Sequence, residues 1–118
     1  MSRMRAIINR SSNWVASLLV LWLVPLSASA SIIEVREGDR IQDAVNAAQP
    51  GDEILVYPGL YSETVYVDKD DITLRGVVEG DNWPHLDGKK QLNDAILYSG
   101  NGFSVEWFKI THYKGNAI

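Results

Sequence analysis

The sequence of 118 residues contains no cysteine, and this absence excludes several kinds of chemistry. A chain without cysteine has no disulfide framework, no thiolate metal site and no cysteine nucleophile. Histidine is also scarce, because the whole chain has two, so a histidine-rich metal site is not expected. We assign no metal ligand to any residue from the sequence.

Basic residues are few once the first 30 residues are set aside. Residues 31–118 hold all 15 acidic residues but eight of the 11 basic ones, so their formal charge is −7 with neutral histidines. A surface of this charge repels the phosphate backbone of DNA and RNA, and we exclude nucleic acid as a partner. The composition, 46% hydrophobic and 22% charged, is that of an ordinary folded chain.

The first 30 residues have the three parts of a secretory signal peptide in the expected order. Three arginines among the first ten residues precede an apolar stretch at 14–26, and residues 28–30 (Ala-Ser-Ala) form a small-x-small cleavage site. The alternative is a retained membrane anchor, because no charged residue occurs from 11 to 33. We favour cleavage, since the apolar stretch is short. The mature chain, 31–118, is then periplasmic or extracellular, without membrane attachment.

One short helix is expected near the start of the mature chain. Its narrow apolar face follows the spacing i, i+3, i+4, i+7 and consists of Ile41, Ala44, Val45 and Ala48. Asp39 is the expected N-cap with Gln42 as its capping-box partner, and the Pro-Gly pair at 50–51 ends the helix. A helix of about ten residues is unstable alone in water, so we expect it to pack on the end of a sheet.

The rest of the mature chain predicts short strands separated by turn residues. No strong two-residue hairpin signal joins any pair of them. A bend or bulge is expected near Phe108, where the alternation of apolar residues slips. The expected strands are 31–36, 53–57, 64–67, 72–77, 85–87, 95–99 and 103–111, with the beginning of another at 117–118.

A loose repeat favours a solenoid over a hairpin sheet. Ile54, Ile72, Ile96 and Ile118 each stand near the start of an apolar run, at spacings of 18, 24 and 22 residues. A repeat of about 20 residues made of short strands is typical of solenoid coils. The alternative on periodicity alone is a fragment of a small β-sandwich.

The motifs along the mature chain resemble those of right-handed parallel β-helix proteins, the pectate lyase-like and pectin methylesterase-like superfamily. Residues 38–52 (GDRIQDAVNAAQPGD) and 54–63 (ILVYPGLYSE) are similar to the opening of these proteins, and 67–76 (VDKDDITLRG) to the piece that follows. Residues 102–111 (GFSVEWFKIT) resemble an interior coil, and 115–118 the start of another. The resemblance implies an all-β, right-handed parallel β-helix solenoid with an N-terminal helix cap and about three coils, here truncated.

The resemblance also bounds the function. The superfamily contains polysaccharide lyases, esterases, hydrolases and epimerases, as well as a periplasmic accessory protein for copper-site assembly. Catalytic residues in the enzymes come from central coils, sometimes with calcium, whereas the motifs matched here are scaffold elements. We therefore assign no catalytic residue and no cofactor to this chain, and we expect no turnover from it alone.

The function expected from the resemblance is that of an exported β-helix protein related to polysaccharide-binding or polysaccharide-processing proteins. The alternatives are a non-enzymatic periplasmic or surface protein with a binding or accessory role, and a truncated remnant without independent activity. Polysaccharide is the expected partner. Self-association is also expected, through the uncapped coil that begins at 117–118.

Four aromatic side chains are candidates for stacking on sugar rings, since aromatic faces suit surfaces rich in C–H groups. Trp83 and Tyr113 lie in predicted loops and are the preferred substrate-binding residues. Trp107 lies within a predicted strand and is expected in the core. Tyr98 completes the set.

Three sets of polar side chains have both a chemical and a structural interpretation. The acidic run Asp68, Asp70 and Asp71 suits calcium or a solvated turn. Asp87 and Asp94 suit a general acid–base pair or turn capping. His85 and His112 suit a proton shuttle, copper ligands or surface positions. In each set we favour the structural interpretation.

Overall fold

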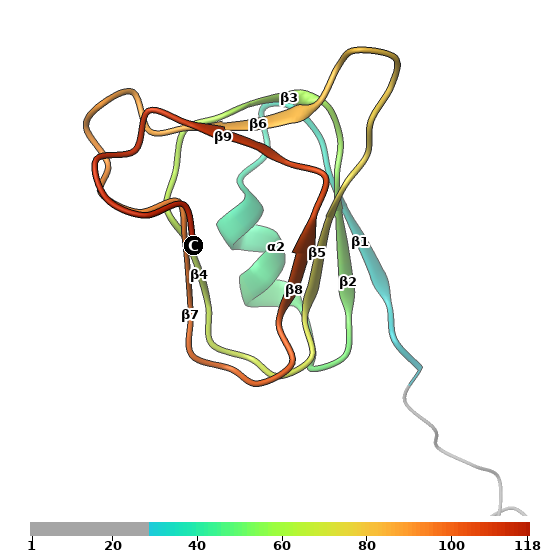
Figure 1. The fold of residues 1–118 in the computed structure, drawn as a ribbon. Helices are drawn as coiled ribbons and strands as arrows, with labels where there is room; N and C mark the ends of the chain where they lie inside the picture. Colours follow the sequence, from blue (N-terminus) through green and yellow to red (C-terminus); the bar gives the residue numbers. More distant parts are fainter. Residues whose placement is uncertain (1–28) are drawn as a thin grey trace, which may run out of the picture.

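The computed structural model describes residues 29–118, and Figure 1 shows how their strands wind around a common interior. The predicted signal peptide, 1–30, lies outside the described residues except for its last two positions. The elements follow in the order β1 (Ile32–Val35), α2 (Ile41–Ala47), β2 (Glu53–Val56), β3 (Gly59–Tyr61), β4 (Val65–Val67), β5 (Thr73–Gly76), β6 (Pro84–Asp87), β7 (Ile96–Tyr98), β8 (Ser104–Glu106) and β9 (Lys109–Thr111).

The strands form three sheets, and each full turn of the chain adds one strand to each of them. The strand orders are β1-β2-β5-β8, β3-β6-β9 and β4-β7. Every strand pair in these sheets is parallel. The result is a β-solenoid of about three turns. This confirms the predicted all-β parallel solenoid and excludes the alternative of a β-sandwich fragment, because parallel strands need the chain to cross over between them.

The stacked residues are not the isoleucines that mark the starts of the apolar runs in the predicted repeat. Ile54 pairs with Leu74, and Leu74 with Val105. Ile72 precedes β5, and Ile96 lies in the third sheet opposite Val65. The physical reason is that loops of unequal length join equivalent strands in successive turns, so a constant count along the sequence does not follow the stacking.

Strand boundaries also correct the prediction at several places. β3 lies where a turn was expected, and Pro84 already belongs to β6. The strand expected at 103–111 is divided into β8 and β9 by Trp107, whose φ is +66°; the bend therefore lies one residue before the expected position. Residues 117–118 form no strand. The carbonyl groups of residues 116 and 117 nevertheless accept the N–H groups of residues 95 and 96, each at 3.1 Å.

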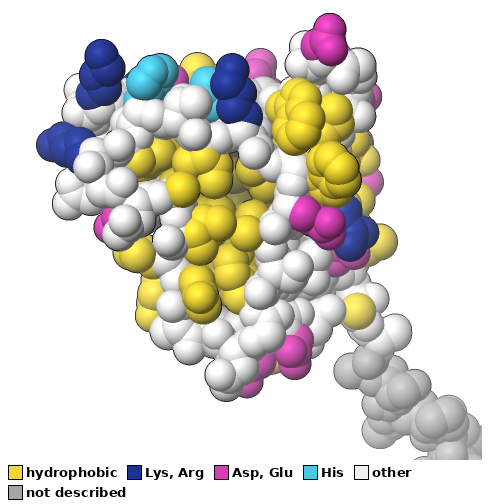
Figure 2. All heavy atoms as spheres, in the orientation of Figure 1, with side chains coloured by type: hydrophobic (Ala, Val, Ile, Leu, Met, Phe, Trp, Pro, Cys, Tyr) yellow, Lys and Arg dark blue, Asp and Glu magenta, His cyan; other side chains and the backbone are white. Residues whose placement is uncertain are grey.

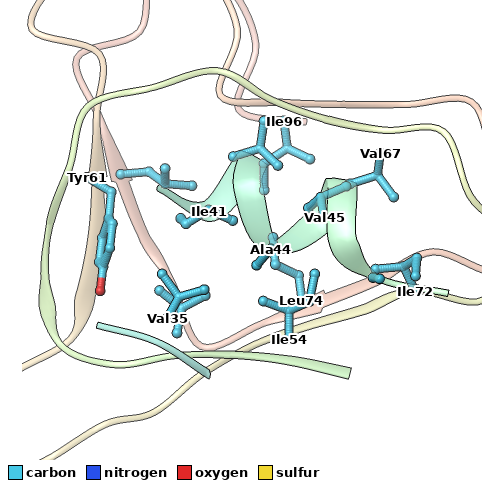
Figure 3. Close-up of a cluster of buried hydrophobic side chains, with 14 of the residues drawn as sticks. Val35, Ile41, Ala44, Val45, Ile54, Tyr61, Val67, Ile72, Leu74 and Ile96 are labelled. Carbon is cyan, nitrogen blue, oxygen red and sulfur yellow. The ribbon is translucent and has the colours of Figure 1, made fainter. Parts of the chain in front are cut away.

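The core is a column of aliphatic side chains inside the solenoid (Figure 3). Alternate residues of each strand point inward, because successive side chains of a strand lie on opposite faces. Ile54 and Leu74, stacked on neighbouring turns, are both fully buried. Along each strand, the residues that alternate with the buried ones face outward and form the surface of the molecule.

Helix α2 covers the interior at the N-terminal end of the solenoid, as predicted for a cap (Figure 1). It packs against β1, β2 and β4, and its apolar face, Ile41, Ala44 and Val45, is buried. In Figure 3 these three side chains lie among the strand residues of the core. The helix thus extends the hydrophobic column at the N-terminal end of the solenoid.

The polar ends of α2 are held by side chains from the next turn, which corrects the predicted capping box. The N-cap residue is Arg40, with no side-chain cap hydrogen bond. The carboxylate of Glu63 instead accepts the N–H groups of Ile41 and Gln42 at 2.9 and 3.0 Å. At the other end, Lys69 Nζ donates to three carbonyl groups at 2.8, 2.8 and 2.6 Å, those of Val45, Asn46 and Ala48.

The predicted N-cap, Asp39, has a different partner. Its carboxylate accepts the N–H of Arg36 at 3.0 Å and therefore closes the turn before the helix. Within residues 29–118, no helix combines the length and the apolar character that crossing a bilayer requires.

Candidate binding groove

A groove of about 850 Å³ lies at the beginning of the stacked strands β3, β6 and β9. One wall is the segment 58–60 with Glu37, and the opposite wall is the segment 81–83. The side chains of His85, Phe108 and Lys109 complete the lining. Its size falls in the range of small-molecule sites in proteins, and its lining mixes aromatic, acidic and basic groups.

The wall that carries Trp83 is a loop held by its own backbone. Glu79 and Asn82 exchange hydrogen bonds of 3.0 and 2.9 Å, which close the protruding loop between β5 and β6 (Figure 1). Pro84 follows directly and is fully buried at the start of β6. Trp83 is therefore fixed between a closed loop tip and a buried strand, with 39% of its surface exposed.

The charges of the groove nearly balance. Glu37 accepts the N–H of Leu60 at 3.1 Å, and Asp81 lies on the other wall. Lys109 supplies the positive charge of the groove. His85 adds little, because burial and then the nearby Lys109 lower the pKa of its imidazole below the usual value. His85 is consequently a neutral imidazole at pH 7.

A chain of polar contacts leaves the groove through His85. Its Nε2 lies 2.6 Å from Oγ1 of Thr111, which is 3.2 Å from Nδ1 of His112. That nitrogen is also 3.0 Å from Oδ1 of Asp87. The pKa of Asp87 is lowered, first by the N–H of Lys89 and then by His112.

This contact chain is not a nucleophile–base–acid triad. In such a triad, the two nitrogens of one imidazole face the hydroxyl and the carboxylate separately. Here the same nitrogen of His112 faces both Thr111 and Asp87. Among the residues that the structure describes, no group of three or more His, Asp or Glu side chains is arranged to hold a metal ion.

The structure places the two preferred substrate-binding residues apart. Trp83 lines the groove, whereas Tyr113 does not. The ring of Tyr113 packs against the core, and its hydroxyl donates to the carbonyl of Glu63 at 2.5 Å. Burial raises the pKa of Tyr113 to about 12. Trp83 is therefore the residue of the two that faces a space for a ligand.

Three of the acidic candidates accept backbone N–H groups of turns, in agreement with the structural interpretation. Asp87 accepts the N–H of Lys89 at 2.9 Å and Asp94 that of Asn116 at 3.0 Å. Asp70 accepts the N–H of Asn101 at 2.8 Å. Each of these carboxylates satisfies a backbone donor of a turn.

Trp107, predicted in the core, is 55% exposed, and that prediction was wrong. The positive φ at Trp107 breaks the alternation of the strand, so Phe108 packs against the core in its place. The ring of Trp107 instead lies 6.0 Å from that of Trp83, between centroids, at an interplanar angle of 47°. The slip in apolar alternation near Phe108 was the sequence signal for this arrangement.

Figure 2 shows how side chains are distributed along this edge of the solenoid. Hydrophobic groups gather where the loop between β5 and β6 protrudes, and basic and histidine side chains gather over β6 and β9. The aromatic and the basic regions are therefore neighbours on one edge.

Comparison with known proteins assigns the chain to no family. No protein-family model matches the sequence, and no curated protein or solved structure matches it significantly. The chain is therefore described by its own structure, a parallel β-solenoid of about three turns with an N-terminal helix.

Proposed function

We propose that the chain is the N-terminal part of an exported, right-handed parallel β-helix protein, similar to the pectate lyase-like superfamily, that binds polysaccharide. The observation that carries this proposal is the groove on the side of the solenoid, with the exposed ring of Trp83 as one wall. The motifs at 38–63 and 67–76 support the family, and the parallel stacking of turns agrees with them.

The groove has the two kinds of group that a sugar needs. An indole face packs against the C–H groups of a pyranose ring. The side chains of Glu37, Asp81, His85 and Lys109 offer both donors and acceptors for its hydroxyl groups. Because the groove lies across the first residues of three stacked strands, a glycan chain can extend from one turn to the next.

The proposal is tested by measuring binding to a panel of soluble polysaccharides that includes pectate, alginate, xylan and a β-glucan. Isothermal titration and tryptophan fluorescence report affinity directly. We expect at least one of the polysaccharides to bind. Trp83→Ala should weaken that binding about tenfold through loss of the stacked ring. Tyr98→Ala is the matched control, since the structure places this fourth stacking candidate, 55% exposed, in the third sheet and outside the lining of the groove.

Two outcomes contradict the proposal. One is the absence of binding to every polysaccharide of the panel by a protein whose circular dichroism shows a folded β structure. The other is an affinity that Trp83→Ala leaves unchanged while Tyr98→Ala lowers it.

A further inference from the structure

We infer that Trp83 and Trp107 together form a stacking site for an uncharged glycan chain, with Trp107 as its second binding residue. The inference rests on the proposed function and names the substrate class and a residue that it leaves open. It is carried by the geometry of the two rings, by the backbone at Trp107 and by the charges around them.

The two indole rings are close but leave each other uncovered. Their centroids are 6.0 Å apart, within the range of interacting aromatic pairs. The rings remain 39% and 55% exposed and meet at an angle of 47°. They therefore present two neighbouring faces that are tilted, which suits successive sugar rings that are rotated relative to one another.

The backbone of Trp107 is in a conformation that a bulky residue adopts at a cost. A φ of +66° lies in the left-handed region, which is unfavourable for a residue with a Cβ. Glycine or asparagine fits there more easily. The indole at this position thus reduces stability, and residues held in such conformations concentrate at ligand sites.

The neighbouring turn fixes this conformation. A Cβ built on Gly76 would collide with the carbonyl oxygen of Trp107 and would lie 2.7 Å from Cγ of Pro84. The backbone of the third turn therefore rests directly on a glycine of the second. Since Pro84 follows Trp83, the same contact sets the position of both tryptophans.

The charges beside the pair favour a neutral ligand. Arg75, on the strand next to β8, is 2.9 Å from Glu106 and 3.0 Å from Glu53, so two carboxylates already neutralise its guanidinium. The groove is lined by one lysine, Lys109, and by two carboxylates, those of Glu37 and Asp81, and the lowered pKa of His85 favours its neutral form. A glycan with a carboxylate on each ring would meet a slightly acidic surface here.

Three basic side chains of this edge lie at the opposite end of the strands, whereas Lys109 begins β9 and lines the groove. Lys89 and Lys90 follow β6, and Lys114 follows β9, whereas Trp83 and Trp107 directly precede β6 and β9 or are one residue removed. Because β6 and β9 are parallel, the tryptophan pair and these three lysines, Lys89, Lys90 and Lys114, occupy separate ends of the sheet.

The test uses neutral β-1,4-linked hexasaccharides of glucose, xylose and mannose, with hexagalacturonate as the acidic probe. We expect a neutral hexasaccharide to bind more tightly than hexagalacturonate at low salt. Trp107→Gly should lower its affinity about tenfold, whereas Trp107→Phe should retain part of it. Tyr98→Ala again serves as the control.

Trp107→Gly separates binding from folding. Glycine relieves the left-handed strain at this position, which offsets the lost contacts with Trp83, so the midpoint of thermal unfolding should stay close to that of the parent protein. Trp107→Asn, which also tolerates this conformation, provides a second variant if the first is poorly folded.

The outcomes distinguish the inference from the proposed function. Loss of binding in Trp83→Ala but full binding in Trp107→Gly overturns the inference and leaves the proposed function standing. Tighter binding of hexagalacturonate than of every neutral probe does the same. If none of the glycans binds, both are overturned.

Discussion

At the scale of single residues, the ends of helix α2 show what local sequence rules miss. The rule for capping boxes selects Asp39 and Gln42, which are close in sequence to the helix start. The structure uses Glu63 at one end and Lys69 at the other, and both come from the following turn. A carboxylate at the N-terminus and an ammonium at the C-terminus also match the helix dipole. No short-range pattern reveals such partners, because the register of the turns brings them together.

This difference gives a test with a built-in control. Glu63→Ala leaves the N–H groups of Ile41 and Gln42 without their acceptor at a buried helix end, and we expect a loss of about 1–3 kcal/mol in the free energy of unfolding. Asp39→Ala, at the position that the sequence rule selects, should cost less, because its contact with Arg36 is exposed. Chemical denaturation of both variants measures the two values. Equal losses would contradict the assignment of Glu63 as the cap.

At the scale of elements, strand existence could be predicted better than strand partners. Alternation and turn residues located most strands within one or two residues, because an inward side chain at every second position is dictated by the core. β3 was missed, since three residues, Gly59–Tyr61, are too short for a pattern. The isoleucine spacing does not give the stacking register, because the segment between β5 and β6 is longer than the segment between β2 and β3. Register in a solenoid is set by the corners, which tolerate insertions.

One corner is tight enough to predict the effect of a single methyl group. Gly76→Ala would place a Cβ against the carbonyl of Trp107, so the third turn must move away from the second. We expect a lower midpoint of thermal unfolding, a blue-shifted or altered tryptophan emission and weaker glycan binding. Thr73→Ala, in the same strand, is the control and should change neither the emission nor the binding. An unchanged emission spectrum in Gly76→Ala would show that the corner is less closely packed than described.

At the scale of the whole molecule, the fold could be predicted but the groove could not. Short strands without strong hairpin signals favoured a solenoid but left a β-sandwich fragment open. The resemblance of the motifs at 38–63 and 67–76 implied the parallel solenoid with its helix cap. The groove is built from four separate segments, around residues 37, 58–60, 81–85 and 108–109. Among the lining residues, Trp83 was the candidate for substrate binding, and His85 was a candidate proton shuttle or copper ligand. Leu60 belongs to β3, which was missed. The slip near Phe108 predicted the bend but not that Phe108 would turn to the core and Trp107 to the surface.

The predicted export of the chain has a consequence for the stability of the whole fold. Cleavage after residue 30 would make Ser31 the first residue, and the backbone nitrogen of Ser31 lies 2.8 Å from Oδ1 of Asp52. Asp52 is 5% exposed, and its pKa is lowered, first by the N–H of Gln49 and then by that of Ser31. The new α-ammonium group would therefore form a charge-assisted hydrogen bond with a buried carboxylate, where the uncleaved chain has an amide.

We expect the protein that begins at Ser31 to unfold at a higher temperature than the same protein with an acetylated N-terminus. Because the pKa of Asp52 is lower in the folded than in the unfolded chain, the stability that it contributes is present above about pH 4, the unfolded value, and is lost as the pH falls. The advantage of the free N-terminus should accordingly disappear in acid, and Asp52→Asn should remove it at neutral pH. Thermal unfolding of the four proteins between pH 3 and 7 measures this. An acetylated protein as stable as the free one at pH 7 would show that the terminus does not pair with Asp52.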